Sequence, residues 1–324
     1  MSTNSLSILH LSDLHVCNTD ADYLFSIHGI AGFLCGGPAL QTDFSSLRRT
    51  VGARAKDADW ILITGDITHT GRIGDLREAR ELIFGMEGDI SNNRGDGCSL
   101  ALIPGNHDRY ENKGPDPGNV GPFEEKFKKF WSIGQGVQFR VLSEQLRVQA
   151  GFADFSLQKK DAVRLPAMEE WRRRPPTASE LRAWLEMWGN GCVHDEVLND
   201  LADSSAGRIS DGWSIIWVIH FAPFHPGFGQ DDWKLRLRNE EKLMSRARDL
   251  GVTHIFCGHT HQQDHYNYEG VEIFCAGQSL RDSRFSKARC FSVRLFLDGG
   301  RLTTQSWENI VRSVVPEGSL SRPR

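Results

Sequence analysis

The sequence predicts an α/β fold with a largely parallel sheet, and two observations support this fold class. Short apolar runs alternate with stretches of helical spacing early in the chain, which is the order that a parallel sheet needs. Several of the apolar runs also end abruptly in turns that carry Gly, Asp, Asn or His. Because the carboxyl ends of parallel strands meet at one edge of a sheet, we expect these polar groups to lie close together.

Three strands and two helices are expected before residue 104. In order along the chain they are 6–11, 42–56, 60–64, 75–86 and 99–103. The runs at 60–64 and 99–103 are short and apolar, as buried strands are. One stripe of the stretch at 75–86 carries Leu76, Ala79, Leu82 and Ile83, which predicts an amphipathic helix.

The rest of the chain is expected to add further helices and strands. The expected helices are 123–131, 178–188 and 239–250, and the expected strands are 213–219, 252–257, 271–276, 290–297 and 301–308. The helix at 239–250 should end at Gly251, since glycine suits helix C-termini. The last two strands should form a hairpin around Asp298-Gly299-Gly300.

Residues 1–312 are expected to form one domain, followed by a polar tail at 313–324. The pattern is hardest to read at 139–211, which we interpret as an accessory insertion packed over the core. Three loops are expected, at 31–38, 110–121 and 224–238. The last of these contains two glycines, two aspartates and a tryptophan, and it resembles a mobile lid.

The composition is that of an ordinary globular protein, with 39% hydrophobic and 25% charged residues among 324. A net charge of −4 gives no overall attraction to nucleic acid or to anionic membranes. The seven cysteines are scattered and include no CxxC pair, which disfavours a disulfide framework and a structural zinc site. No signal-peptide pattern and no membrane-spanning apolar run is visible, so we expect a cytoplasmic protein without a membrane partner.

Five blocks of side chains that can bind a metal follow the apolar runs or end them. They are Asp13-x-His15, Gly65-Asp66, Gly105-Asn106-His107-Asp108, His220 and Gly258-His259-x-His261. Imidazole combined with carboxylate suits zinc, iron or manganese. The glycines let the backbone turn sharply and leave room for metal and substrate. Each block alone is a weak or moderate signal, but the five together predict a metal site.

These blocks, in this order, resemble the calcineurin-like metallophosphoesterase superfamily, whose pattern is D-x-H, G-D, G-N-H-(D/E), H and G-H-x-H. The resemblance spans residues 13–261 and implies a four-layer αββα double β-sandwich with two metal ions at the strand ends. The implied ligands are Asp13, His15 and His261 for the first metal, Asn106, His220 and His259 for the second, and Asp66 between the two. By the same resemblance, His107 would face the phosphate and Asp108 would orient its ring.

Physical chemistry agrees with this division of roles. Two cations about 4 Å apart can share a hydroxide and hold the attacking and leaving oxygens of an in-line displacement. A carboxylate such as Asp66 supplies the negative charge that two close dications need. His107 can then stabilise developing charge or protonate the leaving alkoxide, and a hydrogen bond from its ring to Asp108 would favour the protonated ring.

The substrate class is less sharply indicated. Ser/Thr protein phosphatases carry Gly-Asp-x-Val-Asp-Arg-Gly, whereas residues 65–71 read Gly-Asp-Ile-Thr-His-Thr-Gly. The sequence is more similar to bacterial phosphodiesterases of the cyclic-nucleotide and glycerophosphodiester type. We therefore expect hydrolysis of a small phosphodiester to a monoester and an alcohol, with phosphomonoesters as secondary substrates. A nuclease of the same superfamily is the alternative, disfavoured by the acidic balance, and a non-catalytic binding scaffold is disfavoured because every ligand position is filled.

Other histidines and one basic cluster allow more than one interpretation. His10 alternates with the first strand and is expected in the core. His69 is either near the metals or an ordinary loop residue, and the sequence does not separate the two. His225 is expected to have a structural role in its loop. Arg172-Arg173-Arg174 is expected at a solvated helix end rather than in a phosphate-binding or base-stacking patch.

Overall fold

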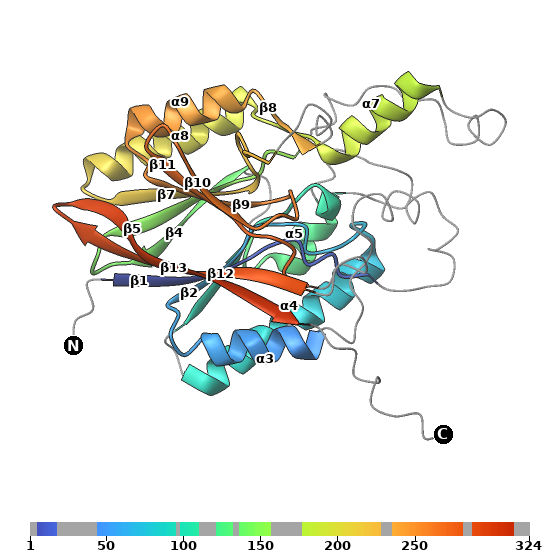
Figure 1. The fold of residues 1–324 in the computed structure, drawn as a ribbon, viewed down its shortest axis with the longest axis horizontal. Helices are drawn as coiled ribbons and strands as arrows, with labels where there is room; N and C mark the ends of the chain where they lie inside the picture. Colours follow the sequence, from blue (N-terminus) through green and yellow to red (C-terminus); the bar gives the residue numbers. More distant parts are fainter. Residues whose placement is uncertain are drawn as a thin grey trace.

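The computed structural model describes residues 5–17, 44–94, 98–109, 121–131, 136–156, 177–227, 235–280 and 287–313. Within these ranges the chain forms two main β-sheets with helices on their outer sides (Figure 1). Several expected features lie outside the described residues: the loop at 31–38, nearly all of 110–121, Arg172–Arg174, residues 228–234 of the expected lid, and the tail from 314.

The first sheet contains β1 (Ser5–Leu11), β2 (Trp60–Ile63), β3 (Ser99–Leu102), β12 (Lys287–Asp298) and β13 (Arg301–Ser313). Its strand order is β13-β12-β1-β2-β3. Strands β1, β2 and β3 are parallel, which confirms the expectation from the alternating strands and helices. Strands β12 and β13 form the expected hairpin, and β12 pairs antiparallel with β1.

The second sheet contains β4 (Val137–Ser143), β5 (Val148–Ala153), β7 (Ser214–Phe221), β9 (His254–Gly258), β10 (Asp264–Tyr268) and β11 (Val271–Cys275). Its strand order is β10-β11-β9-β7-β5-β4. The four inner strands are parallel, and the two edge strands β4 and β10 are antiparallel to their neighbours. A separate short pair joins β6 (Gly191–Cys192) to β8 (Leu237–Arg238).

The described helices are α3 (Phe44–Arg54), α4 (Ile73–Arg94), α5 (Pro122–Phe127), α7 (Ala178–Gly189), α8 (Asp195–Ser210) and α9 (Glu240–Leu250). Helices α3 and α4 cover the first sheet, and α8 and α9 cover the second (Figure 1). The four-layer αββα arrangement is thus confirmed. None of the described helices has the length and hydrophobicity that crossing a bilayer requires.

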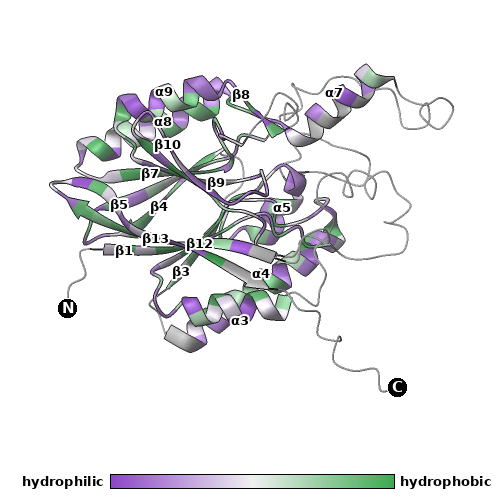
Figure 2. Ribbon diagram, in the orientation of Figure 1, coloured by the Kyte–Doolittle hydropathy of each residue, from purple (hydrophilic) through white to green (hydrophobic). Residues whose placement is uncertain are grey.

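The alternation of side chains along β7 shows how the core is divided. Ile215, Trp217 and Ile219 pack in the cluster that includes α8 and α9. Ile216 and Val218 belong instead to the cluster that contains the first sheet. Because successive strand residues face opposite sides, one apolar run serves both layers. Figure 2 shows the same division, with hydrophobic strands in the middle and many hydrophilic residues on the helices outside.

The segment at 139–211, expected to be an accessory insertion, mostly belongs to this core. It supplies β5 and most of β4 to the second sheet, and its α8 covers that sheet. Of its described elements, α7 projects away from the two sheets (Figure 1), and it begins at Ala178, after the N-cap residue Thr177. The prediction of an accessory insertion is therefore wrong for the part of the segment that forms β4, β5 and α8. Strand β5 is buried along its whole length, but its sequence Val-Gln-Ala-Gly-Phe-Ala contains Gln and Gly and so lacks the continuous apolar run expected of a buried strand.

Candidate metal centre

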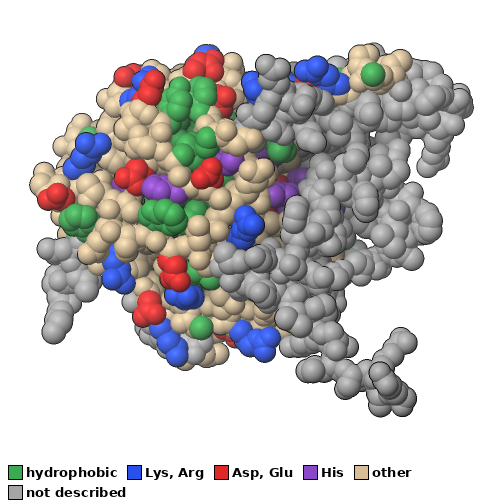
Figure 3. Space-filling model, viewed as in Figure 1, with side chains coloured by type: hydrophobic (Ala, Val, Ile, Leu, Met, Phe, Trp, Pro, Cys, Tyr) green, Lys and Arg blue, Asp and Glu red, His purple; other side chains and the backbone are tan. Residues whose placement is uncertain are grey.

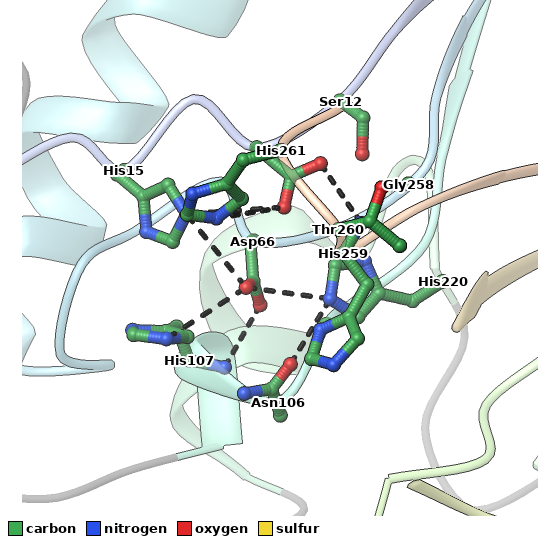
Figure 4. A network of polar contacts seen from close by, with 12 residues as sticks. Ser12, His15, Asp66, Asn106, His107, His220, Gly258, His259, Thr260 and His261 are labelled. Carbon is green, nitrogen blue, oxygen red and sulfur yellow. Dashed lines mark hydrogen bonds and ion pairs between the residues drawn. The ribbon is translucent and has the colours of Figure 1, made fainter. Parts of the chain in front are cut away.

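The five blocks converge at the carboxyl ends of strands from both sheets. Asp13 and His15 follow β1, Asp66 follows β2, and Asn106 and His107 follow β3. From the second sheet, His220 lies near the end of β7, and His259 and His261 follow β9. Figure 4 shows their side chains around Asp66, with His15, His261 and His107 on one side and His220, His259 and Asn106 on the other.

One group of donors comprises Asp13, His15 and His261, whose ligand atoms all lie within 4.8 Å of one another. His15 Nε2 lies 2.9 Å from His261 Nε2. Asp13 Oδ1 lies 3.5 Å from His261 Nε2 and 3.8 Å from His15 Nε2. Two imidazole nitrogens and one carboxylate oxygen at such distances can surround a single divalent ion.

The second group comprises Asp66, His220 and His259, again within 4.8 Å. His220 Nε2 lies 3.3 Å from Asp66 Oδ2 and 3.0 Å from Asn106 Oδ1. His220 Nδ1 is 2.6 Å from the carbonyl oxygen of Thr64. Because a carbonyl only accepts, Nδ1 carries a proton and Nε2 faces the cluster, the orientation expected of a metal ligand. Burial opposes the cationic form of His220, but the carboxylate of Asp66 and the other acceptors around the ring together outweigh burial and raise the pKa of this ring to about 9, so a bound metal ion would replace the proton on Nε2.

The carboxylates of Asp66 and Asp13 each accept a backbone hydrogen bond at one oxygen, and the other oxygen of each faces the imidazoles. The backbone N–H of His107 donates to Asp66 Oδ1 at 2.8 Å, and that of His259 donates to Asp13 Oδ2 at 3.0 Å. Asp13 Oδ1 and both ring nitrogens of His259 are buried and have no hydrogen-bond partner in the structure. Buried polar atoms without partners are costly unless something binds them. The donor set therefore fits two divalent metal ions.

The ionisation of these groups also fits bound cations. Burial opposes ionisation of Asp66, but the surrounding imidazoles, His220 foremost, together outweigh burial and hold the pKa of Asp66 well below its usual range. Burial raises the pKa of Asp13 to about 8, aided by the charge on Asp66. Burial lowers the pKa of His15 and of His259 far below the usual value, so both rings are neutral at pH 7 and can donate lone pairs.

The backbone at these ligands is strained. Asp13, His15, Asp66, His259 and His261 have φ between 47° and 73°, the left-handed region that non-glycine residues rarely adopt. Such a conformation costs about 1–3 kcal/mol per residue and is found mainly at functional sites. The turns between strands and helices therefore place the ligands at the expense of local backbone energy.

Three glycines of the motifs are required by close contacts. A Cβ at Gly105 would overlap Asp66 Oδ1, and a Cβ at Gly65 would lie 2.6 Å from His220 Nδ1. At Gly258 it would overlap Ser12 Oγ and lie 2.6 Å from Asp13 Oδ2. The glycines of the sequence pattern thus bring neighbouring turns together in addition to allowing a sharp bend.

Asp108 does not have the expected role of orienting the His107 ring. Its two oxygens accept hydrogen bonds from the backbone N–H groups of Ile67, Thr68 and Gly105 and from the Thr68 hydroxyl, at 2.7–3.1 Å. It therefore joins the turn after β2 to the turn after β3. The His107 ring is held by the carbonyl oxygen of His69, 2.7 Å from Nδ1.

Of the remaining histidines, His10 lies in the core as expected, with Nε2 3.0 Å from Thr64 Oγ1 and its ring beside Phe256 and Phe291. His225 contacts Asp264 and Tyr266 of β10. His69, left open by the sequence, is buried next to the cluster. A ring nitrogen of His69 lies within 4.8 Å of one in His15 and one in His107.

Comparisons with known proteins agree with this geometry. The family model for calcineurin-like phosphoesterases matches residues 6–263. No curated protein is similar enough in sequence to match the chain. A dimetal phosphatase from Danio rerio superposes with a TM-score of 0.58 at 14% identity, over 94% of this chain and 98% of that one. The calcineurin-like phosphoesterase YfkN from Bacillus subtilis gives a TM-score of 0.43 at 14% identity, over 95% and 90%.

Proposed function

The chain belongs to the calcineurin-like phosphoesterase family, and on that basis we propose that it hydrolyses a small phosphodiester to a monoester and an alcohol. Membership of the family supports the general reaction, which is hydrolysis of a phosphoester with divalent metal ions. The choice of a diester rests on the sequence resemblance to bacterial phosphodiesterases and on the arrangement around His107. Phosphomonoesters are proposed as secondary substrates.

We assign the metal ligands by the two groups of donors. Asp13, His15 and His261 hold the first ion, and Asn106, His220 and His259 hold the second, with Asp66 between the two. When bound, such ions withdraw charge from the phosphoryl oxygens and acidify water, which provides a nucleophile near neutral pH. Manganese, iron and zinc all suit this set of donors.

The His107 ring is the observation that carries the proposal. Its Nε2 lies 3.9 Å from Asp66 Oδ2, inside the cluster, while Nδ1 faces the carbonyl of His69. A carbonyl only accepts, so Nδ1 holds a proton in either charge state of the ring. Nε2 carries a second proton only when the ring is cationic, and this proton is the one available to a leaving alkoxide.

The charge distribution favours a small substrate over nucleic acid. The net charge is −4, and on the face drawn in Figure 3 basic and acidic side chains are interspersed. Binding along a nucleic-acid backbone needs several cationic contacts to phosphates and is steeply weakened by salt. A nuclease therefore remains the second candidate, supported by the shared Asp-x-His and Gly-Asn-His-Asp blocks.

The proposal is tested with bis-p-nitrophenyl phosphate and added manganese. The wild type should release p-nitrophenol. With methyl phenyl phosphate, whose poorer leaving group needs the proton of Nε2, His107→Ala should lower kcat by about a hundredfold or more while metal content stays unchanged. His265→Asn, on β10 beside Glu272, is the control and should keep wild-type kcat. An inert wild type with a full complement of metal would refute the reaction. Cleavage of DNA with steep salt dependence would favour the nuclease instead.

A further inference from the structure

His69 brings a third imidazole to the side of the site where His107 lies. One ring nitrogen from each of His15, His69 and His107 lies within 4.8 Å of the other two. The ring of His69 is 5.5 Å from that of His15 and 5.6 Å from that of His107, between centroids. His69 is 2% exposed, so its position is fixed by the fold rather than by solvent.

The backbone fixes His69 in this place. Its N–H donates to the carbonyl of Val16 at 2.9 Å, and the preceding Thr68 pairs with Val16 in a parallel bridge. Its own carbonyl accepts from His107 Nδ1. The same residue therefore sets the orientation of the His107 ring and places a second imidazole beside it.

Two N–H donors can share one acceptor oxygen only if they are close together. Hydrogen bonds of about 2.9 Å from both donors require nitrogens less than about 5.8 Å apart. One ring nitrogen of His69 and one of His107 lie within 4.8 Å of each other, which is inside this range. Within the proposed reaction, the oxygen next to His107 is the one that leaves.

We propose that His69 is a further catalytic residue, whose ring N–H donates a hydrogen bond to the leaving oxygen of the phosphodiester beside His107. The inference rests on the proposed function. In this step the P–O bond to the leaving group breaks, and its electron pair moves to the leaving oxygen. That oxygen takes the proton from His107 Nε2, while the oxygen of water joins phosphorus and releases one proton to solvent, from which His107 is protonated again. His69 keeps its own proton and stabilises the negative charge that develops on the leaving oxygen.

The test compares two diesters that differ only in the leaving group. Methyl p-nitrophenyl phosphate releases an acidic phenol that needs little help, whereas methyl phenyl phosphate releases a poorer leaving group. We expect His69→Ala to lower kcat for methyl phenyl phosphate at least tenfold and for methyl p-nitrophenyl phosphate less than threefold. His69→Gln, which retains an N–H donor, should recover part of the loss. His265→Asn is the control, and metal content is measured for every variant.

Each outcome has a defined meaning. A wild type that cleaves neither diester refutes the proposed function itself. If the wild type is active and His69→Ala loses the same factor with both substrates, His69 does not act at the leaving oxygen. A fall in bound metal in His69→Ala, with activity lost in proportion, makes His69 a metal ligand and overturns the inference. Unchanged kcat for both substrates in His69→Ala also overturns it.

Discussion

Replacing Gly258 with alanine tests whether this glycine is needed to bring the two sheets together at the metal centre. The added Cβ would overlap Ser12 Oγ and lie 2.6 Å from both Ser12 Cβ and Asp13 Oδ2. Rotating the Ser12 side chain cannot relieve the contact with its own Cβ. Asp13 Oδ2 is held by the N–H of His259, so moving this carboxylate breaks that bond. Overpacking costs about 1–3 kcal/mol, and two simultaneous contacts place Gly258→Ala near the upper end.

The assay measures both stability and metal binding. Unfolding is followed by heating in the presence of a chelator, and metal content is measured separately after reconstitution. For a chain of 324 residues about 3 kcal/mol corresponds to a fall of about 4 °C in Tm. The displaced Asp13 should also reduce metal content. The matched control is Gly207→Ala in α8, where the added Cβ meets nothing within 4 Å, and it should stabilise the helix by about 0.5–1 kcal/mol.

Two results would contradict this reasoning. If Gly258→Ala unfolds at the wild-type temperature, the turns after β1 and β9 are not held as close as described. If Tm falls but metal content stays at the wild-type level, the position of Asp13 does not govern metal binding.

Two further predictions concern buried polar groups. Asp108→Asn should destabilise the metal-free protein by about 2–4 kcal/mol. The reason is that an NH₂ group would face the N–H groups of Ile67 and Gly105, which now share one carboxylate oxygen. An unchanged urea midpoint would contradict the role of Asp108 in joining the two turns. Burial lowers the pKa of His10 to about 3, so below pH 6.5 the unfolded chain binds a proton that the folded chain does not. The free energy of unfolding should therefore fall by about 4 kcal/mol between pH 6.5 and pH 3, at about 1.4 kcal/mol per pH unit. His10→Phe should remove this loss. Parallel curves of stability against pH for the two proteins would refute the prediction.

The residues that converge at the candidate centre could be found from the sequence because each combines a distinctive residue type with a strand end. Asp13 and His15 directly follow an apolar run, and His259 and His261 do the same after β9. A strand end restricts where the next residues can lie, so residue identity and position together are informative. The two-sheet fold itself came from the family resemblance, since the apolar runs do not say which strands pair.

The second sheet was harder to predict for physical reasons. Strand β4 is at an edge, with a mixture of buried and partly exposed residues, and strand β10 has the polar sequence Asp-His-Tyr-Asn-Tyr. Edge strands need no continuous apolar run because one side of each pairs with no strand. Because β4 lacks a continuous apolar run and β5 contains a glutamine and a glycine, the segment at 139–211 resembled an addition to the fold.

The roles of His69 and Asp108 could not be predicted from the sequence for a different reason. The group that holds His107 is a backbone carbonyl, which every residue has, so no sequence pattern marks it. Asp108 is marked by its type, but the sequence does not say whether its carboxylate faces a ring or backbone N–H groups. Long-range hydrogen bonds between the turns after β2 and β3 decide this, and only the fold brings those turns together.

The centre also explains why the fold can hold strained, charged turns. Each proposed metal site takes ligands from both sheets: Asp13 and His15 from the first with His261 from the second, and Asn106 from the first with His220 and His259 from the second. Without cations, two buried carboxylates share the cluster, and the pKa of Asp13 rises to about 8. Cations would favour the ionised form of both carboxylates and join the two sheets at their carboxyl ends. Metal binding at the proposed sites would therefore be coupled to the docking of the two sheets, and the same interactions would stabilise the strained backbone at Asp13, His15, Asp66, His259 and His261.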